Sequence, residues 1–475
     1  MIRNSLLLRK NVKTIYNVLL SSALNTNSCK LNSNFDCVST AYGYKNKWEL
    51  FRGWMLYKMF SYNIFVDHLP QLIALSNQML NRTLFQSIMN MTLYGHFIGG
   101  ENRNQLQLQV EKLRKHRVKV ILDHYMESDL NGVCKETINS LPSGEASFSK
   151  IYHPDEVAFD KNMLKYLKNI QTTHLLCGSK SFTAIKLTPL IRPSLLEKLN
   201  VFCCLHIEKR QFDDLLQLIL HDHNFTSNEI GEINNLILRL NEIVKSTKAN
   251  DMRIFIDAEQ SYFQTAINKI VIHLQSIFNR ENLFVYNTYQ CYRRDTVDVL
   301  AADLEQSERE KFHIGFKLVR GGYMVQERKR ALEMDYEDPI HDDFDQTSEC
   351  YRKAFLKGID FALRTNQITR IFVASHNEDT VRFAIETMKE FNIKSDDEIV
   401  SFATLFGMCD YITFTLAAAN FNSYKLMPYG PLESFLPYLA RRAQDNRAIF
   451  KKAEKDRLLM YKALRDRLFK TQQWC

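Results

Sequence analysis

Eight short apolar segments, separated by longer stretches with helical periodicity, constrain the fold of this chain more than any other feature. They are 118–122, 184–187, 254–256, 284–286, 314–319, 371–374, 400–403 and 425–427. Continuous apolar strands that alternate with helices are typical of a parallel sheet buried on both faces. Eight of them favour closure into an α/β (βα)8 barrel over an open sheet.

The spacing of the predicted strands is uneven. About sixty residues separate the first strand from the second, and the second from the third. The second gap contains an amphipathic segment at 228–243, so both gaps are interpreted as helical insertions. Upstream, apolar residues recur every three or four positions over 46–115, which predicts an N-terminal helical arm, and the barrel is expected over 116–470. Residues 26–45, rich in Asn, Ser and Thr, are interpreted as a linker.

Residues 1–35 carry five basic side chains and no acidic one. On a helix, Leu6, Val12, Ile15 and Leu19 lie on one side and the basic residues largely on another. This pattern is typical of a mitochondrial transit peptide, and a short disordered or amphipathic tail is the alternative.

Charge and cysteine content exclude several classes of protein. The net charge of +8 is concentrated at the two ends of the chain, and the body between them has no basic stripe of the kind that binds nucleic acid. The ten cysteines include no CxxC and no His/Cys cluster at metal-ligand spacing, so neither a zinc site nor a disulfide scaffold is expected. No apolar run reaches the length of about eighteen residues that a membrane-spanning helix needs.

Polar residues follow six of the predicted strands. Parallel barrels carry their active sites at the carboxyl ends of the strands, so these residues are expected to lie together. Lys186 and Lys317 are the most unusual, because a cation inside an apolar strand is costly to bury unless it is paired. For either lysine alone, a structural ion pair or a solvated side chain is the simpler explanation. The polar strand ends are 123–127, Lys186, 257–259, 287–290, 317–323 and 375–377.

A helix is predicted over 431–446, after the last strand. One face carries its apolar residues, and a second face carries Tyr438, Arg441, Arg442 and Asp445. Guanidinium groups bind carboxylates bidentately, so two adjacent arginines beside a tyrosine suit a small carboxylate, although a solvated arginine pair is equally ordinary.

Several long motifs follow one another from the third strand to the C-terminus. They read IDAEQSYFQTAI, YNTYQCY, KLVRGGYMVQER, YEDPI, VASHNEDTVRFA, LFGMCD and PYGPLESFLPYLARRAQDN, with AIKLT and TLYGHFIGGE upstream. In these motifs the chain resembles the proline dehydrogenase family, specifically its eukaryotic mitochondrial branch. The resemblance implies a distorted (βα)8 TIM-like barrel that holds FAD noncovalently without a Rossmann unit, so no G-x-G-x-x-G fingerprint is expected.

The resemblance also implies which residues contact the cofactor. Two of them, Gly321 and Gly322, would let the backbone approach a phosphate closely. The residues that match positions around the flavin and the pyrophosphate are Gln290, Lys317, Arg320, Gly321, Gly322, Ser375, His376, Asn377 and Asp445.

A second set of residues matches the substrate site of the family. Lys186, Arg441 and Arg442 match a clamp for the substrate carboxylate, and Tyr323 and Tyr438 match aromatic residues packed around the substrate ring. Asp257 matches an acid near the site, and Glu127 matches a lid residue that pairs with the first arginine.

The activity implied by the resemblance is the oxidation of L-proline to Δ1-pyrroline-5-carboxylate, the first step of proline catabolism to glutamate. A hydride would pass from C5 to flavin N5, and the electrons would pass to ubiquinone at the matrix side of the inner mitochondrial membrane. The basic segment 451–470 is interpreted either as a solvated helix that caps the barrel or as a peripheral contact with anionic lipid.

Some positions depart from the family pattern. Leu426 stands where proline-specific members of the family usually carry a tyrosine. Hydroxyproline-oxidising relatives also lack that tyrosine, so trans-4-hydroxy-L-proline is an alternative substrate. Thr404 replaces a usual Gln, and LAAANFN at 416–422 replaces LGQAGYP. Two further alternatives are a barrel lyase with a Schiff-base lysine and a non-catalytic binding protein.

Overall fold

The protein folds around a closed barrel of eight parallel strands. The computed structural model describes residues 35–124, 155–433, 435 and 454–469. Each strand pairs in parallel with its neighbours in sequence, and β1 closes the barrel against β8, with Ile121 opposite Leu426. The strands are β1 (Lys119–His124), β2 (Phe182–Ile185), β3 (Arg253–Ile256), β4 (Val285–Gln290), β5 (Ile314–Val319), β6 (Thr369–Ala374), β7 (Val400–Leu405) and β8 (Ser423–Tyr429).

All eight predicted strands are confirmed, with differences at their ends. Strand β4 extends beyond its apolar part to Gln290, because the side chain of Asn287 is buried and bonds to Asn268 on a covering helix. Strand β8 extends to Tyr429. Lys186 lies one residue beyond β2 instead of inside it.

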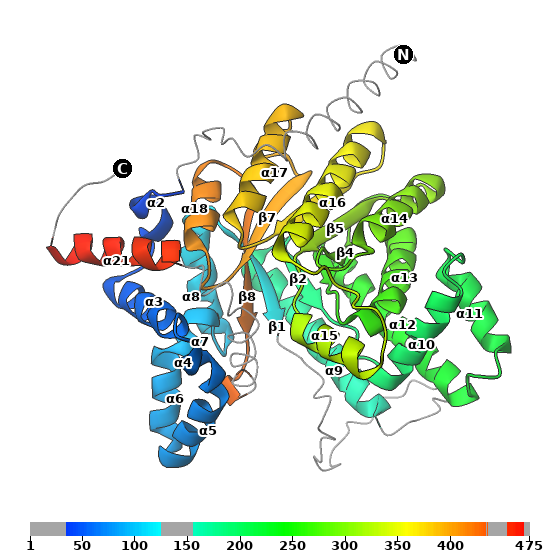
Figure 1. Ribbon diagram of the computed structural model, residues 1–475, viewed down its shortest axis with the longest axis horizontal. Coiled ribbons are helices and arrows are strands. Elements are labelled where there is room, and N and C mark those ends of the chain that lie inside the picture. Colours follow the sequence, from blue (N-terminus) through cyan, green and yellow to red (C-terminus); the bar gives the residue numbers. More distant parts are fainter. Residues whose placement is uncertain (1–34, 125–154, 434, 436–453, 470–475) are drawn as a thin grey trace.

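Helices cover the outside of the barrel (Figure 1). Both predicted insertions contain helices, and α12, in the second, begins with a capping box made by Thr226 and Glu229. These helices are α9 (Glu156–Cys177), α10 (Pro193–Leu205), α11 (Phe212–His221), α12 (Ser227–Ala249), α13 (Ser261–Phe278), α14 (Thr296–Glu310), α15 (Met324–Glu333), α16 (Phe344–Arg364), α17 (Glu378–Glu390) and α18 (Asp410–Ala418).

The predicted N-terminal arm is helical and lies at one side of the barrel, and the helix after the barrel packs on it (Figure 1). The linker prediction is wrong for residues 35–45, because Phe35 and Tyr42 are buried and α2 packs against α18. The helices are α2 (Val38–Tyr42), α3 (Lys47–Phe60), α4 (Asn63–Asp67), α5 (Leu69–Met79), α6 (Arg82–Met91), α7 (Leu93–Phe97), α8 (Arg103–Arg114) and α21 (Glu454–Phe469).

Aromatic rings fill the inside of the barrel. Phe182 and Phe255 stack with ring centroids 5.0 Å apart, and the other rings meet them edge-on or tilted. We call this set the aromatic layer, and it closes the interior between the two ends of the barrel. It consists of Phe182, Phe255, Tyr286, Phe372 and Tyr424.

Within the part of the chain that the structure describes, no helix has the length and apolar character needed to cross a bilayer. The same residues include no group of three or more side chains placed to hold a metal ion.

Candidate active site at the carboxyl ends of the strands

A buried ion pair joins two of the predicted site residues. Lys317 lies in β5, and Asp257 follows β3 directly, with 2.6 Å between Nζ and Oδ1. The two side chains are 10% and 22% exposed. The Lys317 ammonium also lies 4.9 Å from the ring centre of Phe255, in the aromatic layer. The pair therefore holds an ammonium group and its carboxylate partner in the barrel interior near the carboxyl ends of the strands.

Buried polar atoms without a partner lie on the adjacent strand ends. Gln290 Oε1, Thr288 Oγ1 and Arg320 Nη1 make no hydrogen bond with any described residue. Arg320 Nη2 donates to the Phe344 carbonyl at 3.0 Å and to Ser348 Oγ at 2.9 Å. Buried polar atoms are nearly always bonded to something, so these three atoms fit a polar ligand at the ends of β4 and β5.

Position 321 requires a glycine, because of its backbone conformation and because of a neighbouring aromatic ring. Its φ is +140°, and a Cβ at this position would lie 2.4 Å from the ring of Tyr292. The structure thus gives a reason for this glycine that does not depend on a phosphate. The half-buried Gly322 follows and leads to Tyr323, the N-cap residue of α15.

The loop that carries Tyr323 is fixed by Glu327, a residue to which the sequence analysis gave no role. Glu327 is fully buried and accepts hydrogen bonds from Ser261 N at 2.6 Å and from Ser261 Oγ at 2.5 Å. The Glu327 amide donates to the Tyr323 carbonyl at 2.9 Å. Glu327 lies inside the motif KLVRGGYMVQER, but only the fold shows that it joins α15 to the start of α13.

Lys186 lies beside a second residue that sequence reasoning did not single out. Glu259 is 3% exposed and accepts from Leu187 N, Thr188 N and Thr188 Oγ1 at 3.0, 3.1 and 2.6 Å. Burial raises the pKa of the Glu259 carboxyl, while the charge of Lys186 acts in the opposite direction. Glu259 therefore holds the loop after β2, from which Lys186 projects, and its place in the polar strand end 257–259 was the available signal.

The run Ser375–Asn377 follows β6 and makes local contacts. His376 Nε2 accepts from the Leu405 amide at 3.0 Å, which leaves the ring proton on Nδ1. Asn377 caps α17 by accepting from Thr380 N at 2.8 Å, and Ser375 Oγ accepts from the Asn377 amide at 3.1 Å.

Two positions that depart from the family pattern lie on the last strands. Leu426, on β8, is partly buried and packs against the hydrophobic cluster that contains the aromatic layer. Thr404, on β7, accepts from Lys425 Nζ at 2.7 Å and lies 2.7 Å from Thr413 Oγ1. Thr404 thus belongs to a buried polar network outside the barrel interior.

The remaining predicted site residues lie outside the described residues. Of the proposed carboxylate clamp, only Lys186 belongs to the described part of the chain. The predicted site residues that lie outside the described part of the chain are Glu127, Tyr438, Arg441, Arg442 and Asp445.

Comparisons with known proteins agree on one family. The family model described as proline dehydrogenase matches residues 108–455. The chain is 32% identical to "Proline dehydrogenase 1, mitochondrial" of Drosophila melanogaster, over 90% of this chain and 79% of that protein. It is 31% identical to "Hydroxyproline dehydrogenase" of Xenopus laevis, over 86% of this chain and 85% of that protein.

Solved structures show the same fold. Proline utilization A from Bdellovibrio bacteriovorus, inactivated by N-propargylglycine, superimposes with a TM-score of 0.60 at 17% identity. The match covers 96% of this chain and 43% of that one, so this chain spans less than half of the larger protein.

Proposed function

The chain belongs to the proline dehydrogenase family, and from this premise we propose that it is an FAD-dependent enzyme that oxidises L-proline to Δ1-pyrroline-5-carboxylate. Electrons would pass to ubiquinone. The observation that carries the proposal is the Lys317–Asp257 ion pair beside the unpartnered polar atoms of Gln290 and Arg320. Lys317, Gln290 and Arg320 match cofactor positions of the family, and Asp257 matches an acid near the site.

The residues present fit a flavin. Thr288, Gln290 and Arg320 offer buried hydrogen-bonding atoms, and Lys317 and Arg320 offer positive charge at one end of the barrel. Bound FAD supplies the acceptor, N5 of its isoalloxazine, for a hydride from C5 of proline. Fixed cations near the ring favour its reduced, anionic form, and Asp257 keeps the Lys317 ammonium in place.

Substrate binding is assigned to a different set of side chains. Lys186, held by the loop that Glu259 organises, would bind the substrate carboxylate together with Arg441 and Arg442. Tyr323 would pack on the substrate ring with Tyr438, and Glu127 would pair with Arg441. Gly322, Ser375, His376, Asn377 and Asp445 complete the proposed cofactor site.

A second candidate substrate is trans-4-hydroxy-L-proline. Leu426 favours it, because a leucine leaves out the tyrosine hydroxyl that proline-specific members place over the ring. The similarity to "Hydroxyproline dehydrogenase" of Xenopus laevis also supports it.

The test is anaerobic mixing of the purified protein with each amino acid while flavin absorbance is followed at about 450 nm. Bleaching by L-proline supports the leading proposal, and faster bleaching by hydroxyproline supports the alternative. A colourless protein that takes up no FAD would contradict both. Reoxidation of the bleached flavin by a soluble ubiquinone analogue tests the electron acceptor.

We also propose a mitochondrial location, on the matrix side of the inner membrane, with residues 1–35 as the targeting segment, 46–115 as the helical arm and 116–470 as the catalytic barrel. Fusing residues 1–35 to a fluorescent protein tests this. Import that is lost when Arg3, Arg9, Lys10 and Lys13 become Gln supports targeting, and a cytosolic unaltered fusion would contradict it.

We also propose that the C-terminal helix contacts anionic lipid. Some basic side chains of this helix already contact other parts of the protein. Lys455 pairs with Glu378 at 2.8 Å, and Arg467 donates to the carbonyls of Tyr42 and Gly43. Flotation with liposomes tests the rest of the helix. Binding that ignores salt and anionic lipid content would contradict the proposal.

A further inference from the structure

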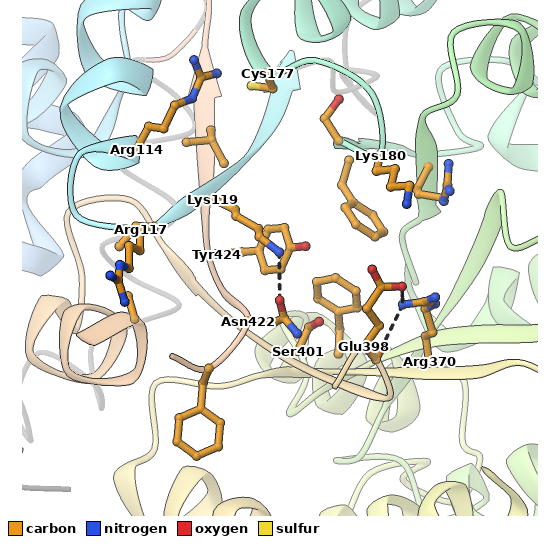
Figure 2. Close-up of a pocket in the computed structure, with 18 of the residues that line it drawn as sticks. Arg114, Arg117, Lys119, Cys177, Lys180, Arg370, Glu398, Ser401, Asn422 and Tyr424 are labelled. Carbon is orange, nitrogen blue, oxygen red and sulfur yellow. Dashed lines mark hydrogen bonds and ion pairs between the residues drawn. The ribbon is translucent and has the colours of Figure 1, made fainter. Parts of the chain in front are cut away.

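A cavity lies at the opposite end of the barrel from the candidate active site. It has a volume of about 700 Å³ and opens among the amino ends of the strands. Figure 2 shows Lys119, Asn422 and Tyr424 close together, with the Arg370–Glu398 ion pair beside Ser401. The cavity is lined at the amino ends of the strands, whereas the proposed reaction is assigned to residues at their carboxyl ends, so the cavity belongs to no step of that reaction.

Positive charge and aromatic rings dominate the lining. Two acidic side chains, Asp396 and Glu398, face six basic ones. Four rings of the aromatic layer, those of Phe182, Tyr286, Phe372 and Tyr424, also line it. The basic residues are Arg114, Arg117, Lys119, Lys180, Arg253 and Arg370.

The hydroxyl of Tyr286 is buried in the cavity wall without a partner. Tyr286 is fully buried, and its Oη bonds to no described residue. Burial raises the pKa of this phenol, while the charges of Arg370 and Arg253 act in the opposite direction. A buried hydroxyl without a hydrogen bond is costly, so an acceptor atom supplied by a ligand would stabilise it.

Arg253 and Arg370 have hydrogen-bond donors that contact no described residue. Their side chains are 13% and 27% exposed. The hydrogen bonds and ion pairs that they make with described residues all use Nη1, which contacts Asp251 and Met252 in one case and Glu398 in the other. Nε and Nη2 form the edge of a guanidinium that binds a carboxylate or phosphate bidentately, and in both residues it is available.

We propose that this cavity is a binding site for a small organic anion. Its acidic group, a phosphate or a carboxylate, would bind Arg253 and Arg370 and accept the hydrogen bond of Tyr286, and its apolar body would lie on the aromatic rings. The volume is typical of sites for small organic molecules. Barrel enzymes react at the carboxyl ends of their strands, so this ligand is separate from the substrate.

The test is binding of small anions to the full-length protein loaded with its cofactor. The probes are phenyl phosphate and benzoate, with inorganic phosphate as an acidic group without an apolar body and sodium chloride as an ionic-strength control. Isothermal titration and the midpoint of thermal unfolding report binding without any need for activity. We expect saturable binding of phenyl phosphate or benzoate, at least about tenfold tighter than inorganic phosphate, since apolar burial adds to the charge.

Two variants locate the site. Tyr286→Phe removes a hydroxyl that bonds to no described residue, so the protein should fold normally and bind the probe about tenfold more weakly. Arg370→Gln, combined with Glu398→Gln, should weaken binding by a similar factor or more. Arg309→Gln, an exposed residue of α14 that does not line the cavity, is the matched control and should bind normally.

Three outcomes would overturn the proposal. The first is the absence of saturable binding by all three anions. The second is binding of inorganic phosphate as tight as that of the aromatic probes, because it removes the role of the rings. The third is unchanged binding in Tyr286→Phe. This result would contradict the proposed site even if the Arg370 variant fails to fold.

Discussion

At the scale of single residues, Lys317 has a structural and a chemical explanation at once. The sequence analysis set a structural ion pair against a functional cation as alternatives, and the structure shows the ion pair. The ammonium group of Lys317 also lies over the Phe255 ring, at the end of the barrel that carries the unpartnered polar atoms, so the paired lysine is still placed at the proposed site.

Asp257→Asn separates these two roles. Removing one partner of a buried ion pair leaves the other charge uncompensated, so we expect the free energy of unfolding to fall by about 3 kcal/mol. We also expect turnover on proline to fall at least about tenfold, as catalysis by fixed charges implies. Denaturant unfolding and steady-state kinetics measure these two quantities, and the flavin content shows whether the cofactor is still bound.

The double variant Asp257→Asn/Lys317→Met is the control for that experiment. An apolar replacement of both partners should restore most of the stability, because no buried charge is left unpaired. Turnover should stay low. Full activity in the double variant would mean that the pair is only structural.

Leu426→Tyr tests the substrate preference. Leu426 packs against the hydrophobic cluster inside the barrel, where a larger ring and a hydroxyl would reduce the space beside C4 of the substrate. We expect the ratio of kcat/KM for proline over hydroxyproline to rise about tenfold, the usual effect of a small change in a pocket. Leu426→Met, of similar volume, is the matched control. A ratio equal in both variants would remove Leu426 from the specificity site.

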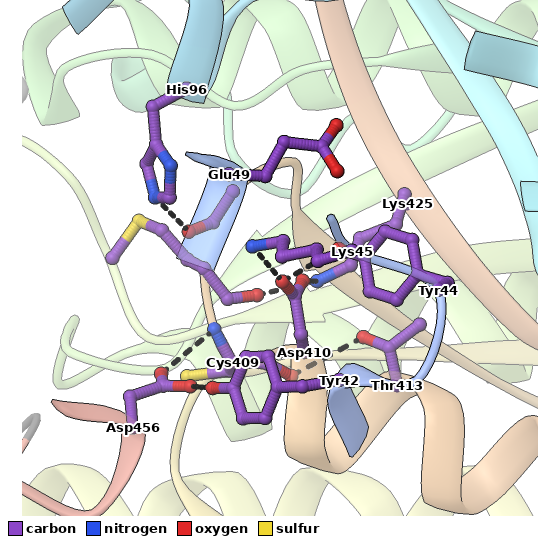
Figure 3. A network of polar contacts seen from close by, with 12 residues as sticks. Tyr42, Tyr44, Lys45, Glu49, His96, Cys409, Asp410, Thr413, Lys425 and Asp456 are labelled. Atoms are coloured by element: carbon purple, nitrogen blue, oxygen red, sulfur yellow. Dashed lines mark hydrogen bonds and ion pairs between the residues drawn. The ribbon is translucent and has the colours of Figure 1, made fainter. Parts of the chain in front are cut away.

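At the scale of elements, one carboxylate holds three segments together. Asp410, at the start of α18, pairs with Lys425 of β8 at 2.9 Å and with Lys45, after α2, at 2.6 Å, and it accepts from the Tyr44 hydroxyl at 2.7 Å (Figure 3). Burial alone would raise its pKa, but Lys425 and Lys45 hold the pKa of Asp410 well below its ordinary range. The short segment around α2 is therefore part of the folded protein.

Asp410→Asn should be strongly destabilising. It leaves the buried ammonium groups of Lys425 and Lys45 without their counter-charge, so the free energy of unfolding should fall by about 3–5 kcal/mol. Asp360→Asn breaks an exposed pair with Arg364 on α16 and should cost about 0.5 kcal/mol or less. Denaturant unfolding of both variants measures the difference, and equal small losses would contradict the network.

At the scale of the whole molecule, Asp456 joins the two ends of the described chain to the barrel. It lies on α21 and accepts hydrogen bonds from the Tyr42 hydroxyl and, at 3.0 Å, from the Cys409 amide (Figure 3). Burial raises the pKa of Asp456 to about 6, and the nearby Asp410 carboxylate adds to the shift. The folded protein therefore holds a proton on Asp456 more tightly than the unfolded chain does.

The stability of the protein should depend on this proton. A raised pKa in the folded state gives a contribution that is complete below the ordinary value of 3.8 and is lost as the pH rises through about 6. Asp456→Asn, which stays neutral, should thus gain about 1 kcal/mol relative to the unaltered protein when the pH rises from about 5 to about 7.5.

Unfolding of both proteins at the two pH values measures this difference. Asp466→Asn, on the same helix and partly exposed, is the control and should show no such change. A constant difference between the Asp456 variant and the unaltered protein would show that Asp456 titrates normally.

The barrel could be predicted from the sequence alone. Apolar runs such as 314–319 form strands where both faces of the sheet are buried, here by helices outside the barrel and by side chains inside it, and their number and alternation with helices depend on local pattern alone. The same pattern placed Lys317, Asp257 and Gln290 at the carboxyl ends of strands. The family motifs added the proposed roles of these residues, since each motif lies within a single segment.

Contacts between side chains that are distant in the sequence could not be predicted and are seen only in the folded protein. Glu327 and Ser261 are far apart in the sequence, as are Glu259 and Thr188, and no periodicity relates them. The segment 35–45 was misinterpreted as a linker for the same reason. Its polar composition gives no sign that its side chains bond to Asp410 and Asp456, which are distant in the sequence. The cavity at the amino ends of the strands likewise combines residues from across the chain. Its basic residues lie close together only because the barrel closes.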